Sequence, residues 1–342
     1  MRNDRVSRIT GFPKNSRVKS APAGLTLMTR WNYKKLMNLT ARPHLIIILF
    51  LSLGIFPITG DAGTTKEEVA EFENCKEKAR SGNAFHQFNV GLCYQQGLGV
   101  AKDVANAVNW HLKAANQGYS NAQLQLGIIY STGSGVPRDP VKAVYWLRKA
   151  ADQGDSWGQY YLGTAYYSGE GVAKDFEDAA SWFRKAADQG NALAQYNLGA
   201  CHSYGHGVER DQVMAASMYR KAAEQGYAAA QYNLAVHYAT GEGLAKDPVK
   251  AASWYKKAAE QGLVPAHTNL GVCYAKGQGV AKDEIEAYAH WNLAAITDNG
   301  ARNHLAALEA NLTREEIADG QKRTKELQKE IEAKIAAKKA GK

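Results

Sequence analysis

The sequence repeats itself every 36 residues, and this period constrains the fold more than any other feature. Each of six copies contains a Gly-x-Gly pair, and an Asp follows four residues after it. The pairs are Gly97/Gly99, Gly133/Gly135, Gly169/Gly171, Gly205/Gly207, Gly241/Gly243 and Gly277/Gly279, and the aspartates are Asp103, Asp139, Asp175, Asp211, Asp247 and Asp283. A fixed period between about 20 and 50 residues is typical of solenoids and propellers, in which each unit stacks on the next.

Each copy contains the pattern of two helices. In the second copy Ala122, Leu126 and Tyr130 are spaced by four residues, which predicts one face of an α-helix. The corresponding helix of the first copy is expected over residues 84–96, and the Gly-x-Gly pair ends it because glycine adopts the backbone angles of a tight connection. The repeated Asp is suited to N-cap a second helix, and a Gln-Gly pair closes that helix. A Trp recurs in the second helix, at Trp110, Trp146, Trp182 and Trp254, and is expected in the core.

These columns resemble the Sel-1-like repeat family, which is related to the tetratricopeptide class. The family pattern Ala-x-x-x-Leu-Gly-x-x-Tyr, Gly-x-Gly-Val, Asp, Ala-x-x-Trp, Lys-Ala-Ala and Gln-Gly runs through residues 83–298. The departures are His202, Met218, Ala235 and the sixth copy, where His290-Trp291 shifts the aromatic by one residue. The resemblance implies an all-α fold, an α/α solenoid of six 36-residue two-helix repeats wound as a right-handed superhelix.

The resemblance also implies a function. Such proteins are typically non-catalytic adaptors that hold partner proteins or peptides, here in the cell envelope. Two alternatives remain open: a secreted β-lactam-binding or hydrolysing protein, as some cysteine-rich members of the family are, and a structural envelope spacer. Because fold alone does not fix function, the choice depends on the site.

The first 62 residues have the composition of a leader. Residues 45–58 (LIIILFLSLGIFPI) are apolar, basic residues precede them, and small residues follow, which is the pattern of a secretory signal with cleavage after Ala62. Met28 and Met37 lie closer to this segment than Met1, so residues 1–27 or 1–36 are expected not to be translated. The chain is expected to be exported, periplasmic or secreted. The alternative is an uncleaved anchor in the cytoplasmic membrane, which is the one membrane contact we expect.

Polar helices flank the repeats. Thr65 and Glu68 form the capping-box pattern of an N-terminal capping helix within residues 63–82, and Thr313 and Glu316 form another within residues 299–342, which hold a C-terminal capping helix and a charged tail. The net charge of +9 belongs to residues 1–60, which hold ten Lys/Arg and one acidic residue, whereas the rest of the chain is neutral overall. We therefore expect no nucleic-acid partner.

No motif of a catalytic, cofactor or metal site stands out. The chain lacks G-x-x-x-x-G-K-[ST], H-E-x-x-H and G-x-G-x-x-G. Cys201, His202 and His206 lie close in the sequence, but a fourth ligand is missing, so we expect no metal site and no cofactor. Cys93, Cys201 and Cys273 share one slot in copies that are too far apart for disulfides between them. A Cys75–Cys93 disulfide between facing helices and four buried thiols remain the two alternatives.

A polar column on the first helices is the candidate binding groove. Asn89, Asn197, Asn233 and Asn269 share one slot, and four residues further on a second column contains His237. Both columns are expected to face the interior of the superhelix, where Asn amides donate to and accept from a peptide backbone. The alternative is that these Asn bond within the scaffold. In that case the partner surface moves to the variable loop residues Ser134, Glu170, His206 and Gln278.

Overall fold

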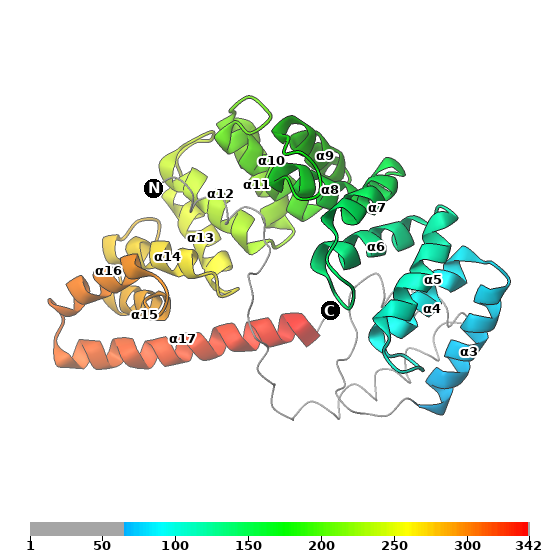
Figure 1. Cartoon of the computed structure of the whole chain (residues 1–342). Coiled ribbons are helices and arrows are strands. Elements are labelled where there is room, and N and C mark those ends of the chain that lie inside the picture. The colour runs from blue at the N-terminus through cyan, green and yellow to red at the C-terminus, as the bar shows by residue number, and fades with distance from the viewer. Residues whose placement is uncertain (1–64, 341–342) are drawn as a thin grey trace, which may run out of the picture. The chain divides into compact units, whose positions relative to one another are not determined.

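The computed structural model describes residues 65–340, which form fifteen α-helices and no strand (Figure 1). The helices are α3 (Lys66–Arg80), α4 (Ala84–Gln96), α5 (Val104–Asn116), α6 (Ser120–Thr132), α7 (Pro140–Asp152), α8 (Ser156–Ser168), α9 (Phe176–Asp188), α10 (Ala192–Tyr204), α11 (Gln212–Glu224), α12 (Ala228–Thr240), α13 (Pro248–Ala259), α14 (Val264–Lys276), α15 (Glu284–Ala294), α16 (Asn299–Glu309) and α17 (Arg314–Ala340). The all-α solenoid is confirmed. The leader, its apolar segment 45–58 and the expected cleavage after Ala62 lie outside the described residues. Within the described part, no helix combines the length and the apolar character of a membrane span.

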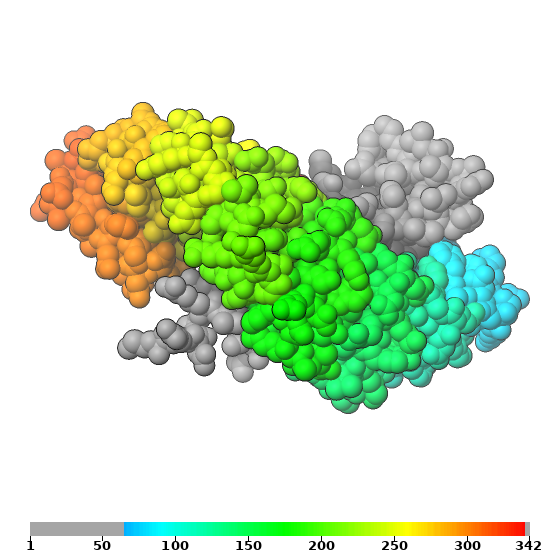
Figure 2. All heavy atoms as spheres, turned by 90° about the horizontal axis from the view of Figure 1, so that it is seen from above, coloured from blue at the N-terminus to red at the C-terminus, as the bar shows by residue number. Residues whose placement is uncertain are grey.

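The helices stack in chain order, and residues 65–335 belong to one compact unit. Each first helix packs on the second helix of its own repeat and on the second helix of the preceding repeat. The surface shows the same order, because the colours of successive repeats follow one another from cyan to orange (Figure 2). Stability in such an array comes from each repeat and its two neighbours rather than from a single central core.

The caps of the helices are those expected from the sequence. The Asp139 carboxylate accepts from the Lys142 backbone N–H at 3.0 Å, and the equivalent aspartates cap the other second helices. Gly97 ends α4 with φ 79°, and the first glycine of every later pair does the same. The capping box of Thr65 and Glu68 opens α3. Local sequence therefore determines where most of these helices begin and end.

In each repeat, the residue that follows the Trp position in the sequence is the one that lies in the core. Phe183 is 2% exposed and packs against Gly163 of α8, where a Cβ would lie 2.8 Å from the Phe183 ring. The same position is occupied by His111, Leu147, Tyr219, Tyr255 and Trp291, all buried. Trp182, in contrast, is half-buried, and Lys185 Nζ lies 3.8 Å from its ring centroid. The expectation that the Trp column lies in the core is therefore corrected: of the four, only Trp146 is buried. The next residue turns 100° further around the helix and faces the first helix.

Buried glutamines join the helices across each repeat boundary. Gln123 of α6 donates through Nε2 to the Ala115 carbonyl at the end of α5, and its Oε1 accepts from Gln153 Nε2 at 2.6 Å. The same pair recurs as Gln87–Gln117, Gln159–Gln189, Gln195–Gln225 and Gln231–Gln261. Each pair ties three consecutive helices together and satisfies carbonyls that a helix end leaves open. This is the structural reason for the repeated Gln-Gly.

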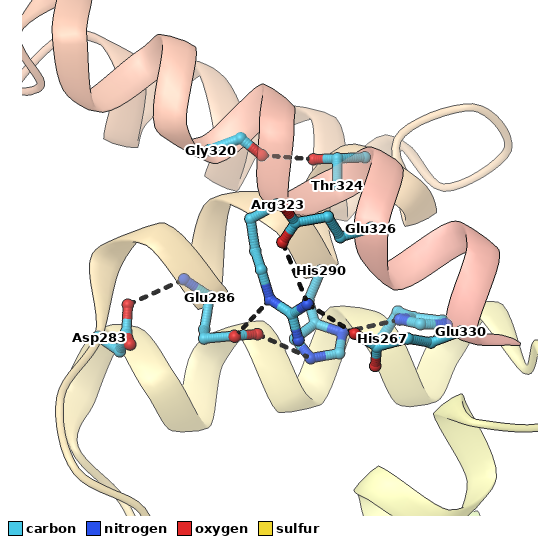
Figure 3. A network of polar contacts seen from close by, with 9 residues as sticks. All are labelled: His267, Asp283, Glu286, His290, Gly320, Arg323, Thr324, Glu326 and Glu330. Atoms are coloured by element: carbon cyan, nitrogen blue, oxygen red, sulfur yellow. Dashed lines mark hydrogen bonds and ion pairs between the residues drawn. The ribbon is translucent and has the colours of Figure 1, made fainter.

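In the sixth repeat a histidine replaces this glutamine. His267 Nδ1 lies 2.8 Å from His290 Nδ1, and His290 Nε2 lies 3.9 Å from the Glu286 carboxylate (Figure 3). Arg323 of α17 donates to Glu286 at 2.6 Å, so this network fixes α17 on α15. Burial lowers the pKa of His267 to about 4 and that of His290 to about 3, so both rings are neutral at pH 7.

Apolar residues complete the contact of α17 with the sixth repeat. Leu327 and Ile331 are buried against Ala289 of α15, and Thr324 is also buried, which matches the stripe expected on this helix. The Thr313 hydroxyl accepts from the Glu316 backbone N–H, and the Glu316 carboxylate accepts from the Thr313 N–H, so the second capping box is confirmed. The long helix α17 thus covers the outer side of α15.

Candidate functional site

Three columns along one side of the first helices contain no charged side chain, and we call them the first-helix face. Its members differ in exposure, and Leu92, Thr164, Asn197 and Ala200 are buried. In the central repeats it consists of Trp157, Tyr161 and Thr164 of α8 and of Leu193, Asn197 and Ala200 of α10. The equivalent positions elsewhere are Phe85, Asn89, Leu92, Asn121, Gln125, Ile128, Ala229, Asn233, Val236, Pro265, Asn269 and Val272. These positions are three or four residues apart, so they lie along one side of each helix.

The asparagine column lies on this face and bonds to the preceding repeat. Asn269 Nδ2 donates to the Tyr232 hydroxyl at 3.4 Å, Asn197 bonds to the Tyr160 hydroxyl, and Asn233 bonds to that of Tyr196. Asn197 is 4% exposed, whereas Asn89, Asn233 and Asn269 are half-buried. The column therefore holds tyrosines in place between repeats, which is the scaffold role left open by the sequence. Its binding of a peptide stays a prediction.

The second predicted column faces the core instead of the groove. Cys201 is fully buried, Cys273 is 7% exposed and His237 is 5% exposed. His237 Nδ1 lies 2.7 Å from the Glu242 carbonyl oxygen, so its N–H closes the following loop. Four residues advance a helix by about 400°, which turns the side chain roughly 40° from the Asn column toward the second helix. A direct contact of His237 with a partner stays untested.

Aromatic residues on α8 and α10 are the part of the site that the sequence analysis missed. Trp157 is 46% exposed and its ring centroid lies 6.2 Å from that of Tyr161. Burial beside Tyr161 raises the pKa of Tyr160 to about 12, and the hydrogen bond from Asn197 opposes this shift. Tyr204, at the end of α10, is 62% exposed. The signal was in the sequence of α8, SWGQYYLGTAYYS, which has five aromatic residues where the equivalent helices have fewer.

The cysteines are free, and two of them lie together. Cys75 and Cys93 pack against the buried cluster of Phe72, Ala79 and Val90. Burial raises the pKa of Cys75 to about 11 and that of Cys93 to about 12, so both thiols are protonated at neutral pH. Cys75 and Cys93 pack on the same cluster, as expected for residues on facing helices. The disulfide between them stays a prediction.

The histidines considered as metal ligands have partners within the protein. His202 Nδ1 lies 3.3 Å from the Glu209 carbonyl oxygen, and His206 Nδ1 lies 2.8 Å from the Tyr167 hydroxyl. The His206 ring stacks on Phe176 with centroids 4.8 Å apart, so this loop residue packs on the preceding repeat. Among the described residues no group of three or more His, Cys, Asp or Glu is arranged to hold a metal ion.

Among the loop residues that form the alternative site, Glu170 and His206 contact a neighbouring repeat, whereas Ser134 bonds within its own repeat. Glu170 accepts from Arg138 at 2.7 Å, and Ser134 lies 2.8 Å from the Thr132 hydroxyl. Gln278 is exposed. The ion pair is itself exposed, so its contribution to stability is below about 1 kcal/mol.

Comparison with known proteins places the chain in one family. A model of the Sel1 repeat matches residues 87–119, 120–155, 158–191, 192–227, 228–263 and 264–296. A protective antigen of uropathogenic Escherichia coli strains with an SLR fold is 33% identical with a TM-score of 0.73, covering 92% of this chain and 66% of that one. A Sel1 repeat protein from Oxalobacter formigenes is 31% identical with a TM-score of 0.57, covering 67% of this chain and 97% of that one.

A curated relative matches over a shorter region. Chitin synthase regulatory factor 3 of Schizosaccharomyces pombe is 37% identical over 73 residues, which are 21% of this chain and 8% of the relative. The chain thus spans a small part of that relative and about two thirds of the Escherichia coli antigen. Because the Sel1 model matches more than half of the chain in six consecutive copies, the chain belongs to the Sel1 repeat family.

Proposed function

We propose that this protein is a non-catalytic scaffold of the cell envelope that binds a protein or peptide partner through the first-helix face. Sel1 repeats form scaffolds that typically mediate protein–protein interaction. The observation that supports this face is Trp157, which is 46% exposed and lies beside the half-buried Tyr161, in columns that contain no charged side chain. Exposed aromatic side chains supply much of the binding energy at protein interfaces, because they bury a large area at low entropic cost.

The envelope location rests on the leader. Its basic residues, the apolar segment 45–58 and the small residues before Gly63 are typical of an export signal. Cleavage after Ala62 would release the repeats outside the cytoplasmic membrane, and retention of the segment would anchor them there. Sequencing the N-terminus of the protein from cell fractions tests this part: a mature chain beginning at Gly63 supports export, and an intact residue 1 on cytoplasmic protein contradicts it.

A site-specific crosslinking experiment tests the binding face. A benzoylphenylalanine replaces Trp157 in one full-length variant and Tyr145 in another, because Tyr145 is a similarly exposed aromatic residue, at 53%, on the second helix α7. Irradiation in cells of the source organism should give a defined crosslinked protein from position 157 and none of comparable yield from position 145. The same product from both positions, or a product from position 145 alone, would contradict the assignment of the face.

A further inference from the structure

The buried histidine pair of the sixth repeat has a defined arrangement of protons. The Nδ1 atoms of His267 and His290 are 2.8 Å apart, so one of the two rings donates and the other accepts. The second ring nitrogen of His267 donates to the Ala259 carbonyl, as the glutamines of the other repeats do to the equivalent carbonyl. Because a neutral imidazole has one N–H, His267 Nδ1 is the acceptor of the pair and His290 Nδ1 is the donor.

This arrangement leaves one lone pair free, at His290 Nε2. The nitrogen lies 3.9 Å from Glu286 Oε2, and the other oxygen of this carboxylate accepts from Arg323 Nε at 2.6 Å (Figure 3). A proton added to the pair therefore goes to His290 Nε2 and turns it into a second donor for the same carboxylate. Glu286 thus lies between two groups that compete for it, one on α15 and one on α17.

The charges around His290 oppose this proton while α17 is docked. The titratable and charged groups that surround the ring come from four helices. They are Lys256 of α13, His267 and Tyr274 of α14, Glu286 of α15 and Arg323 of α17. Burial, and then the charges of His267, Arg323 and Lys256, lower the pKa of His290 to about 3. The docked state is therefore the one with neutral histidines.

The ion pair of Arg323 is a main part of the contact between α17 and α15. The other carboxylates near this guanidinium, Glu326 and Glu330, lie on α17 itself, so Glu286 is its partner on the repeats. The buried side chains of α17 are Thr324, Leu327 and Ile331. A further ion pair, Lys334 with Glu260 of α13, is partly exposed and contributes little. A terminal helix with so few buried side chains opens more easily than the helices inside the array.

We propose that α17 is a lid that acid releases: a proton on His290 Nε2 draws the Glu286 carboxylate away from Arg323, and α17 leaves α15. Release uncovers the apolar cluster of Ala289, Leu327 and Ile331. It also opens His290 Nε2 to water, so the proton favours the released state and the released state favours the proton. Each pH unit below about 6.5 shifts the equilibrium up to tenfold toward release, and at neutral pH the lid stays closed.

Hydrogen–deuterium exchange of the full-length chain at pH 7.0 and pH 4.5 tests the lid, with labelling times scaled for the intrinsic pH dependence of exchange. The readout is the protection of α17 relative to that of α9, which lies in the middle of the array. This ratio should fall at least tenfold at pH 4.5, whereas α14 should keep its protection. One histidine allows a shift of at most about 100-fold over these two pH units below 6.5.

Three full-length variants identify the groups that respond. His290→Asn removes the nitrogen that takes the proton, so acid should change the ratio less than twofold. Glu286→Gln removes the charge for which the two donors compete, so α17 should already lose protection at pH 7.0 and respond less to acid. His206→Gln changes a histidine in the loop of the fourth repeat and should behave like the unmodified chain.

Four results would overturn the proposal. They are an unchanged ratio at pH 4.5, an equal loss of protection in α17 and α9, a loss in α14 at the same pH as in α17, and a full acid response of His290→Asn. The second result indicates global unfolding, and the third indicates opening of the whole sixth repeat rather than of the lid. If His290→Asn does not fold, Glu286→Gln decides the question, because a full acid response of that variant would equally refute the exchange of partners.

Discussion

The contact between consecutive repeats can be tested at a single glycine. Gly207, the second glycine of the pair between α10 and α11, has φ 69°, and its Cα lies directly on the first turn of α9. A methyl group added there would overlap the carbonyl of Phe176, which is backbone and cannot rotate away. Gly207→Ala is therefore expected to separate the loop of the fourth repeat from the second helix of the third.

Gly190 provides a matched control. It also has a left-handed φ, 87°, but no atom would lie within 4 Å of an added Cβ. An alanine in the left-handed conformation destabilises the folded chain by about 1–2 kcal/mol. Alanine also reduces the conformational entropy of the unfolded chain, which offsets about 0.4–1 kcal/mol of this loss. Gly190→Ala should therefore lose about 1 kcal/mol. Gly207→Ala adds an overpacking cost of about 1–3 kcal/mol and should lose about 2–4 kcal/mol in total.

The measurement is urea denaturation of the full-length variants, followed by circular dichroism at 222 nm. Repeat arrays depart from two-state unfolding, so the shift of the midpoint relative to the unmodified chain is compared rather than one extrapolated free energy. The midpoint of Gly207→Ala should fall clearly further than that of Gly190→Ala. If the two midpoints fall equally, the backbone conformation alone explains the glycine and the reasoning on inter-repeat contact is wrong.

Three further variants test the core, the pH response and the asparagine column. Phe183→Ala should lower the free energy of unfolding by about 3–5 kcal/mol and Trp182→Ala by about 1–2 kcal/mol, so the urea midpoint should fall further for Phe183→Ala. A larger effect of Trp182→Ala would show that the Trp column lies in the core after all. Unfolded histidine titrates near pH 6.5 and folded His267 near 4, so the unfolded chain binds the extra proton and stability falls as the pH falls through this window. His267→Gln introduces the glutamine that the other repeats have at this position. Between pH 7 and 4.5 this variant should lose about 1–3 kcal/mol less of its free energy of unfolding than the unmodified chain, and an unchanged pH profile would contradict this. Asn197→Ala with Asn233→Ala should lower the urea midpoint, since two hydrogen bonds of about 0.5–1.5 kcal/mol are removed; an unchanged midpoint would show that the column does not hold the tyrosines.

Much of the fold could be predicted because it depends on local chemistry. The first helix of the first copy was expected over residues 84–96 and is observed as Ala84–Gln96. Aspartate caps and left-handed glycines act within a few residues of themselves, so one copy is enough to read them. Neighbouring positions on a helix are harder to assign, because 100° separates Trp182 from Phe183 and only the packing of the first helix shows which one is enclosed.

The residues of the proposed binding face were predicted only in part for the same reason. The asparagine column was expected to line the groove, but Asn197 is buried, and hydrogen bonds of the column to Tyr160, Tyr196 and Tyr232 reach into the preceding repeat. Such contacts depend on the offset between stacked repeats, which periodicity within one repeat does not give. The aromatic residues of α8 were visible in the sequence, but nothing in the sequence distinguished exposed rings from buried ones.

A residue that departs from the repeat pattern can therefore indicate either a structural adaptation or a binding position, and the burial of its side chain distinguishes the two. The sixth repeat departs at His267 and His290, and both side chains are buried under α17, so the change adapts the last repeat to a helix that replaces a further repeat. The third repeat departs at Trp157, where the first-helix position is small or aliphatic in the next three copies, and this side chain is 46% exposed. An end cap explains the first change, because the histidines fill an enclosed contact. Trp157 packs against Tyr160 and Tyr161, but almost half of its side chain stays exposed, and the proposed partner would cover this part.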